Sequence, residues 1–121
     1  EMQVERIDVT NRYANAVVSG DTIYLAGLTG DSTLEEGIVE QSRDIFAQID
    51  SLLSNCGSDK TKLLSMTCWI ADLDDYDGFN QAYDDWIDPA HLPARATVRA
   101  DLVDPMFRIE IMATARRQAK P

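Results

Sequence analysis

Residues 94–100 (ARATVRA) and 107–115 (FRIEIMATA) alternate between small or apolar side chains and polar ones. A period of two is the pattern of a β-strand that has one buried face and one polar face. Asp104-Pro105 breaks the alternation and marks the connection between the two strands. If the strands pair as a hairpin, Arg95 and Glu110 share the polar face, directly opposite or as diagonal neighbours, depending on the register.

Four further strands are predicted upstream of this pair. Residues 63–71 (LLSMTCWIA) are apolar, β-branched and aromatic, which indicates a buried central strand. Residues 3–9 alternate and indicate a strand. Residues 15–19 and 22–26 flank the short turn Gly20-Asp21, which predicts a hairpin.

A long amphipathic helix is expected between the hairpin and the central strand. Ser32 with Glu35, or Thr33 with Glu36, offers a capping box at its start. Gly57 ends it, because glycine readily adopts the left-handed conformation that follows a helix. Its apolar stripe at helical spacing is Ile38, Ile45, Ile49, Leu52, Leu53 and Cys56.

A shorter helix is expected between the central strand and the C-terminal pair. Asp74 or Asp75 is the predicted cap, and the helix ends before Pro89 because the residue ahead of a proline avoids helical geometry. The apolar stripe is Phe79, Ala82, Tyr83 and Trp86.

The order β-β-β-α-β-α-β-β predicts an α+β protein, a six-stranded, mostly antiparallel sheet with two helices on one face. Length favours a single domain over residues 2–117, followed by a tail at 118–121. Two helices cover only one face of such a sheet. The other face would carry Tyr24, Trp69 and Met112, or their alternates, which are too apolar for water, so we predict a homo-oligomer.

Composition narrows the possible partners. The chain is 45% apolar and 26% charged, as in globular proteins, and its formal net charge is -10. That charge opposes binding to nucleic acids and to anionic membranes, which depends on lysine and arginine contacts. Cys56 and Cys68 fit neither a disulfide framework nor a metal-binding spacing, and we expect both as core residues in a cytoplasmic protein.

Common catalytic motifs are absent from the sequence. It contains no phosphate-binding, dinucleotide-binding, zinc-protease or nucleophile-elbow motif. A single histidine, His91, rules out a histidine-rich metal site, and we interpret it as a surface loop residue. The acidic run 72–77 lacks the spacing of a calcium loop and is interpreted as a solvated helix cap. We therefore predict no metal site.

Two interpretations of Arg95 and Glu110 are open. On a solvated sheet face they form an ordinary surface ion pair, which contributes little to stability. On a face covered by a neighbouring subunit, Arg95 is suited to bidentate capture of a carboxylate. Glu110 can then hold and polarise a water molecule. The predicted oligomer would supply that cover.

The motifs that include these residues resemble the RidA family, the YjgF-type reactive intermediate deaminases, over nearly the whole chain. The strongest match is Pro93-Ala94-Arg95 followed by Ile109-Glu110-Ile111. Further matches are Tyr13, Ala26-Gly27 and Phe79-Asn80 with Tyr83. Asp85-Trp86 and the short loop before Pro93 resemble a YoaB-like branch.

The resemblance implies a chorismate-mutase-like fold assembled as a homotrimer, with sites in the clefts between subunits. It implies hydrolysis of reactive enamines and imines, such as 2-aminoacrylate, to 2-keto acids and ammonia, without a metal or organic cofactor. Arg95 would bind the substrate carboxylate and Glu110 would position the attacking water. Tyr13 would line the cleft from across the subunit interface, and Ala26, Gly27 and the backbone around Thr97 would form the walls.

Departures from the family pattern keep an alternative function open. Many members have Ser-Gly-Gln where this chain has Ala26-Gly27-Leu28, and Cys in place of Thr97; Asp101 is also unusual. These changes make the predicted pocket less polar. The alternative is a trimeric binding module for keto acids or similar metabolites that does not turn them over. A ribonuclease or translation-inhibitor role, assigned to some relatives, is disfavoured by the net charge of -10.

Overall fold

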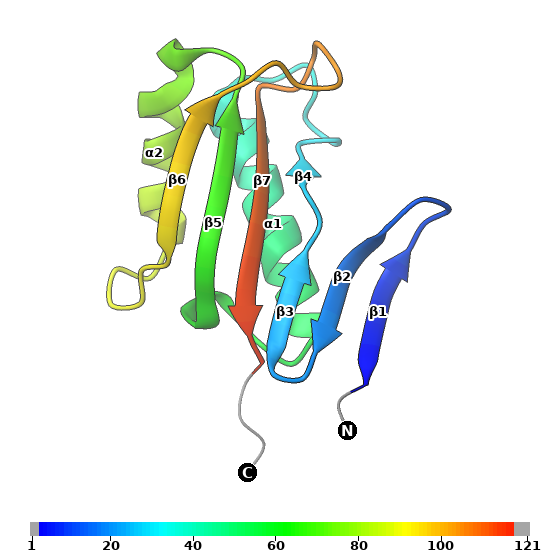
Figure 1. Ribbon diagram of the computed structural model, residues 1–121. Coiled ribbons are helices and arrows are strands. Elements are labelled where there is room, and N and C mark those ends of the chain that lie inside the picture. Colours follow the sequence, from blue (N-terminus) through cyan, green and yellow to red (C-terminus); the bar gives the residue numbers. More distant parts are fainter. Residues whose placement is uncertain (1–2, 118–121) are drawn as a thin grey trace.

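The strands form one sheet, and both helices pack on the same side of it (Figure 1). The computed structural model describes residues 3–117, so the predicted tail at 118–121 lies outside the described residues. Strand order across the sheet is β1-β2-β3-β7-β5-β6, and β4 also pairs with β7. The strands are β1 (Val4–Val9), β2 (Ala14–Ser19), β3 (Thr22–Leu25), β4 (Leu28–Thr29), β5 (Leu63–Ile70), β6 (Ala94–Arg99) and β7 (Ile109–Arg116).

This arrangement confirms the predicted α+β class and the two helices on one face. Within residues 3–117 the sheet has seven strands rather than six, because the two-residue strand β4 was not predicted. The first hairpin forms as expected: Ser19 pairs with Thr22, and Gly20 adopts a positive φ of 60°.

The predicted hairpin between the last two strands is wrong. Strand β5 lies between β6 and β7, parallel to the first and antiparallel to the second (Figure 1). The β5-α2-β6 segment is therefore a crossover unit, in which a helix returns the chain to the same end of the sheet. The apolar β5 is buried on the helix side, and its central position places it between two strands that we expected to be neighbours.

The first turn of the long helix also differs from prediction. Helix α1 (Ile38–Asn55) begins after Gly37, which makes no side-chain cap, so the predicted capping boxes do not form. Asp44, inside the helix, instead ties the preceding loop to α1: its Oδ2 accepts hydrogen bonds from the Ser32 amide at 3.0 Å and the Thr33 hydroxyl at 3.1 Å. The C-terminal end agrees with prediction, since Gly57 follows the helix with φ of 73°.

The shorter helix has its cap one element earlier than expected. A 3-10 turn (Leu73–Asp75) precedes α2 (Tyr76–Trp86), and the Asp72 carboxylate caps that turn through the Asp74 amide at 2.9 Å. Asp75 makes no side-chain cap. No helix within residues 3–117 is long and apolar enough to cross a membrane.

The core lies between the sheet and the two helices. Phe46 of α1 stacks on Trp86 of α2, with centroids 4.4 Å apart and planes 4° from parallel. Ile45, Ile49 and Leu53 of the predicted stripe are fully buried. Burial of each such side chain contributes about 1.5–3 kcal/mol, so this layer fixes α1 and α2 on the sheet.

Gln41 ties two loops together at the end of the sheet where α1 begins. Its side chain is fully buried, and the two N–H groups of Nε2 are shared among the carbonyls of Leu34, Glu36 and Met106, which lie 3.1–3.3 Å from that nitrogen. Oε1 accepts from the Arg108 amide at 2.9 Å. One side chain thus satisfies polar backbone groups on both the 31–36 loop and the 101–108 connection.

We expect Gln41→Leu to lower the free energy of unfolding by roughly 2–4 kcal/mol, because it leaves several buried backbone groups without partners. The matched control is Gln81→Leu on the exposed side of α2, for which the change should stay within about 0.5 kcal/mol. Urea denaturation followed by circular dichroism measures both. Equal effects from the two variants would contradict the role given to Gln41.

Candidate functional site

The predicted site residues line two separate cavities. Tyr13, Ala26, Gly27 and Glu110 gather around one open cavity of about 630 Å³, here called the Glu110 cavity. Arg95 and Thr97 line another of about 300 Å³, the Arg95 cavity. The Glu110 cavity also includes Ala14, Thr29, Asp31, Val103, Phe107 and Met112, and the Arg95 cavity includes Ile70, Leu73, Tyr76 and Val98.

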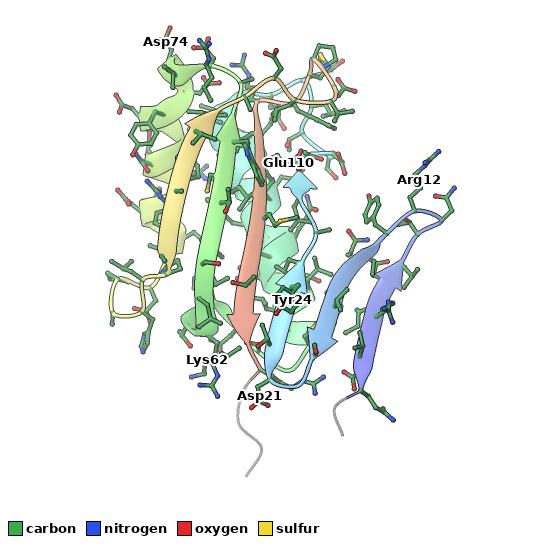
Figure 2. The ribbon with its side chains drawn as sticks, viewed as in Figure 1. Arg12, Asp21, Tyr24, Lys62, Asp74 and Glu110 are labelled. Atoms are coloured by element: carbon green, nitrogen blue, oxygen red, sulfur yellow. The ribbon has the colours of Figure 1, made fainter. Side chains whose placement is uncertain are left out.

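Glu110 lies on the face of the sheet away from the helices, beside β4 (Figure 2). It pairs with Thr29 of β4 on one side and Trp69 of β5 on the other. Its carboxylate lies against Gly27, where an added Cβ would overlap Oε2. Gly27 is therefore required for close approach: any larger residue would push the carboxylate away from this wall.

A short turn presents Tyr13 at the rim of the same cavity. The Thr10 hydroxyl oxygen accepts hydrogen bonds from the amides of Arg12 at 3.2 Å and Tyr13 at 3.1 Å. The Thr10 amide donates to the Tyr13 carbonyl at 2.8 Å. The backbone is thus fixed while the Tyr13 side chain remains 55% exposed, free to contact a ligand or a neighbouring molecule.

Arg95 lies on the helix side of the sheet, under α2. Its guanidinium carbon is 4.7 Å from the centroid of Tyr83 and 5.1 Å from that of Phe79, within cation–π range. Nη2 donates to the Tyr76 hydroxyl at 3.4 Å. Within residues 3–117 Arg95 forms no ion pair, so its charge is held by aromatic rings and is available to an anion.

The prediction that Arg95 and Glu110 share a face is wrong for a single chain. Arg95 aligns with the buried Met66, whereas Glu110 aligns with Trp69, and adjacent positions on β5 point to opposite faces. The intervening strand β5 is the cause, because β6 and β7 each pair with β5 and not with each other, so the register of each pairing decides which face its side chain is on. A single chain therefore brings Tyr13, Gly27 and Glu110 together but separates them from Arg95.

Two groups beneath Arg95 are buried. The Thr97 hydroxyl oxygen is buried and has no hydrogen-bond partner among the described residues. Burial raises the pKa of the Cys68 thiol to about 11, with the Arg95 charge and the neighbouring Thr97 hydroxyl acting in the opposite direction. Cys68 is thus a protonated core residue, as the sequence indicated.

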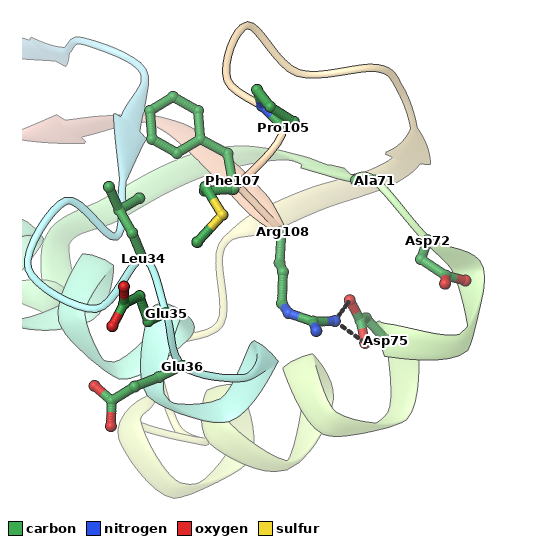
Figure 3. Close-up of a pocket in the computed structure, with 10 residues that line it drawn as sticks. Leu34, Glu35, Glu36, Ala71, Asp72, Asp75, Pro105, Phe107 and Arg108 are labelled. Carbon is green, nitrogen blue, oxygen red and sulfur yellow. Dashed lines mark hydrogen bonds and ion pairs between the residues drawn. The ribbon is translucent and has the colours of Figure 1, made fainter.

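The remaining candidates have structural surroundings. His91 is exposed in its loop, with Nδ1 3.1 Å from Asp88 Oδ2, as expected for a surface residue. In the acidic run, Asp75 forms an ion pair with Arg108 at 3.2 Å at the edge of a third cavity of about 330 Å³ (Figure 3). Among residues 3–117, no three His, Cys, Asp or Glu side chains are placed to hold a metal ion.

Sequence reasoning missed Tyr76, Phe107 and Met112 as lining residues. The sequence pattern predicts Met112 only for the face opposite the core and Phe107 only for the start of a strand. Tyr76 begins α2, and its contact with Arg95 follows from the β5-α2-β6 crossover. The strand-helix-strand order of residues 63–99 is the sequence signal that could have placed Tyr76 beside Arg95, had it been interpreted as a parallel crossover.

These features define a small α+β protein with a basic and an acidic cleft on opposite faces of its sheet. The sequence model of the Endoribonuclease L-PSP family matches residues 3–117. The RutC family protein YoaB of Escherichia coli K12 is 35% identical over 114 residues, covering 94% of this chain and 98% of that protein. A YjgF-family crystal structure from Neisseria meningitidis, 36% identical, gives a TM-score of 0.95 and covers 98% of both chains. The chain belongs to the YjgF/RidA family and is YoaB-like.

A more distant relative carries the name of an activity. The 2-iminobutanoate/2-iminopropanoate deaminase of Capra hircus is 29% identical over 108 residues, covering 85% of this chain and 78% of that protein. Because the more similar relative is named only as a RutC family protein, the comparison supports an imine deaminase role in general terms.

The raised pKa of Cys68 predicts slow alkylation of the folded protein. At pH 8 a thiol with a pKa of about 11 is roughly one-thousandth ionised, whereas an unfolded cysteine with a pKa of about 8.5 is roughly one-quarter ionised. Iodoacetamide should therefore label Cys68 at least about 100-fold more slowly in buffer than in urea. Peptide mass spectrometry separates it from Cys56. Rapid labelling in buffer would show an accessible thiolate and contradict its core assignment.

Proposed function

We propose that the protein hydrolyses small 2-imino acids and their enamine forms, such as 2-aminoacrylate, to 2-keto acids and ammonia. The observation that carries the proposal is a guanidinium held by aromatic rings in one cleft and a carboxylate beside a glycine wall in another. The first group suits a substrate carboxylate, and the second suits a water molecule. The distant relative named as an imine deaminase supports the same reaction class.

Arg95 binds the substrate in this scheme. A guanidinium offers parallel N–H groups that match the two oxygens of a carboxylate. The rings of Phe79 and Tyr83 hold its plane, so little side-chain freedom is lost when the anion binds. Fixing the carboxylate also fixes the adjacent C=N carbon, which converts a bimolecular attack into an oriented one.

Glu110 directs the water. Its carboxylate accepts a proton as the water oxygen forms a bond to the C=N carbon, and the imine nitrogen takes up a proton to give a carbinolamine. The carbinolamine hydroxyl then gives its proton to Glu110 and forms the C=O bond as the C–N bond breaks, the proton passes to the leaving nitrogen, and the keto acid and ammonia are released. No covalent nucleophile is needed, which agrees with a protonated, buried Cys68.

The two clefts meet only if a second copy of the chain covers the open face of the sheet. That face exposes Tyr24, Val98 and Met112, each at 46–50% of its full area, and such apolar surface favours burial in an interface. We propose a homotrimer in which Arg95 and Thr97 of one subunit face Tyr13, Gly27 and Glu110 of the next. Each site then needs two subunits.

Of the two departures from the family pattern near the Glu110 cavity, only Ala26 lines it. Ala26 lines the Glu110 cavity and leaves its wall apolar, as the sequence indicated. Leu28 instead is buried in the core opposite Ile111, so it does not form the pocket wall. The expected loss of polarity is therefore confined to Ala26 in this cavity, and Arg95 and Glu110 remain to carry the reaction.

Hydrolysis is tested by supplying 2-aminoacrylate from a serine dehydratase and following keto acid release. Wild type should accelerate release, Arg95→Ala should return it to the rate without protein, and Glu110→Gln should lower it roughly 100-fold or more. Arg43→Ala and Glu40→Gln, exposed on α1, are matched controls that should retain the full rate. Keto acid binding by the wild type without acceleration would instead establish a binding module.

Sharing of the site between subunits is tested by coexpressing the two inactive variants. In mixed trimers a subunit with Glu110→Gln supplies Arg95, and a neighbour with Arg95→Ala supplies Glu110. Random mixing should restore about one-quarter of the wild-type sites. Size-exclusion chromatography with light scattering should give three times the 13.5 kDa chain mass. A site contained in one chain would show no restoration, and a monomeric mass would exclude the trimer.

A further inference from the structure

The Tyr76 hydroxyl is left with a proton to donate. Arg95 has only donor groups, so in their 3.4 Å contact the Tyr76 oxygen must be the acceptor. The phenol O–H then needs another acceptor, and within residues 3–117 it has none. Tyr76 is 41% exposed at the start of α2 and lines the Arg95 cavity, where a ligand can reach this hydroxyl.

Thr97 supplies a second hydroxyl in the same cavity. Its Oγ1 atom is buried from solvent and has no hydrogen-bond partner among the described residues. The Cys68 thiol beside it is a weak hydrogen-bonding group and a poor substitute for an oxygen acceptor. A buried hydroxyl without a partner is destabilising, and native proteins seldom keep one without a reason. Because Thr97 is two residues from Arg95 on the same strand, both side chains point to the same face.

The cavity thus combines a guanidinium with two hydroxyl groups and contains no carboxylate. Ile70, Leu73 and Val98 form the rest of its lining. A carboxylate has about four lone-pair positions, of which a bidentate arginine uses two. Two further donors fit the remaining positions.

We propose that Tyr76 and Thr97 donate hydrogen bonds directly to the ligand carboxylate and so complete the anion-binding end of the Arg95 cavity. The inference rests on the proposed function, because it takes Arg95 to be the carboxylate-binding group. It adds that specificity for a carboxylate depends on three side chains from two elements, β6 and the first turn of α2. Tyr76 and Thr97 bind the ligand and take no part in the bond changes.

The test measures binding of 2-oxobutanoate, a keto acid product, by isothermal titration to the full-length assembled protein. Tyr76→Phe keeps the aromatic ring and should raise Kd roughly ten-fold, as expected for loss of one hydrogen bond to a charged group. In steady-state assays KM should rise by a similar factor with little change in kcat. Ser51→Ala, which removes an exposed hydroxyl from α1, is the control and should leave Kd unchanged.

Thr97→Val should change the thermal midpoint and ligand binding in a combination that a purely structural role of Thr97 would not produce. Removing a buried, unpartnered hydroxyl should raise the thermal midpoint of the ligand-free protein while weakening 2-oxobutanoate binding several-fold. A lower thermal midpoint together with unchanged Kd would show that Thr97 only supports the fold, and would overturn its part of the proposal.

An Arg95→Lys background separates direct contact from an effect through Arg95. Lysine keeps the charge and removes the guanidinium contact with Tyr76. If Tyr76→Phe raises Kd by the same factor in both backgrounds, Tyr76 contacts the ligand. If Tyr76→Phe has no effect in the Arg95→Lys background, Tyr76 acts only by orienting Arg95 and the proposal fails.

The failure of this inference can be told apart from the failure of the proposed function. Loss of 2-oxobutanoate binding in Arg95→Ala, with no loss in Tyr76→Phe or Thr97→Val, would overturn this inference alone. Unchanged binding in Arg95→Ala would overturn the proposed function.

Discussion

The position of β5 between β6 and β7 is the constraint on which the rest of the structure depends. Side chains of β5 alternate between the two faces, and a residue paired with β5 points to the same face as its partner. Arg95 pairs with Met66 and points toward the helices, whereas Glu110 pairs with Trp69 and points away from them. A register shift of one residue would exchange those faces. The separation of the two clefts is therefore a consequence of strand pairing and needs no special feature in either cleft.

Core packing and the proposed ligand-binding group Arg95 use the same aromatic residues. Phe79 and Tyr83 face the sheet in the layer that contains Phe46 and Trp86, and the same two rings support the Arg95 guanidinium. The packing of α2 on α1 thus sets the position of the charge. A guanidinium supported by rings keeps its net charge, whereas one paired with a carboxylate would be neutralised before any substrate arrived.

Local patterns predicted the fold class well because each depends on few residues. Alternation indicated the strands, the stripe ending at Cys56 indicated α1, and Gly20 and Gly57 indicated a turn and a helix end. Strand neighbours were predicted wrongly because pairing is decided by contacts between distant segments, which no local period records. The predicted positions of the site residues were affected by the same error in strand pairing. Tyr13 was expected across the subunit interface, whereas it lies beside Gly27 and Glu110 of the same chain, and Arg95 was assigned to the wrong face.

The open face of the sheet is suited to cover by another subunit because its central hydroxyls already bond to each other. Ser65 Oγ and Thr114 Oγ1 are 2.6 Å apart, so one hydroxyl donates to the other and only a single O–H of the pair is left for a covering neighbour to satisfy. Glu110 differs, since within residues 3–117 its carboxylate has neither an ion pair nor a hydrogen bond. Covering such a charge costs free energy unless donors are supplied. In the proposed assembly a water molecule and the bound substrate would supply those donors. The Glu110 carboxylate, whose burial opposes assembly, is therefore also the group that the proposed reaction requires.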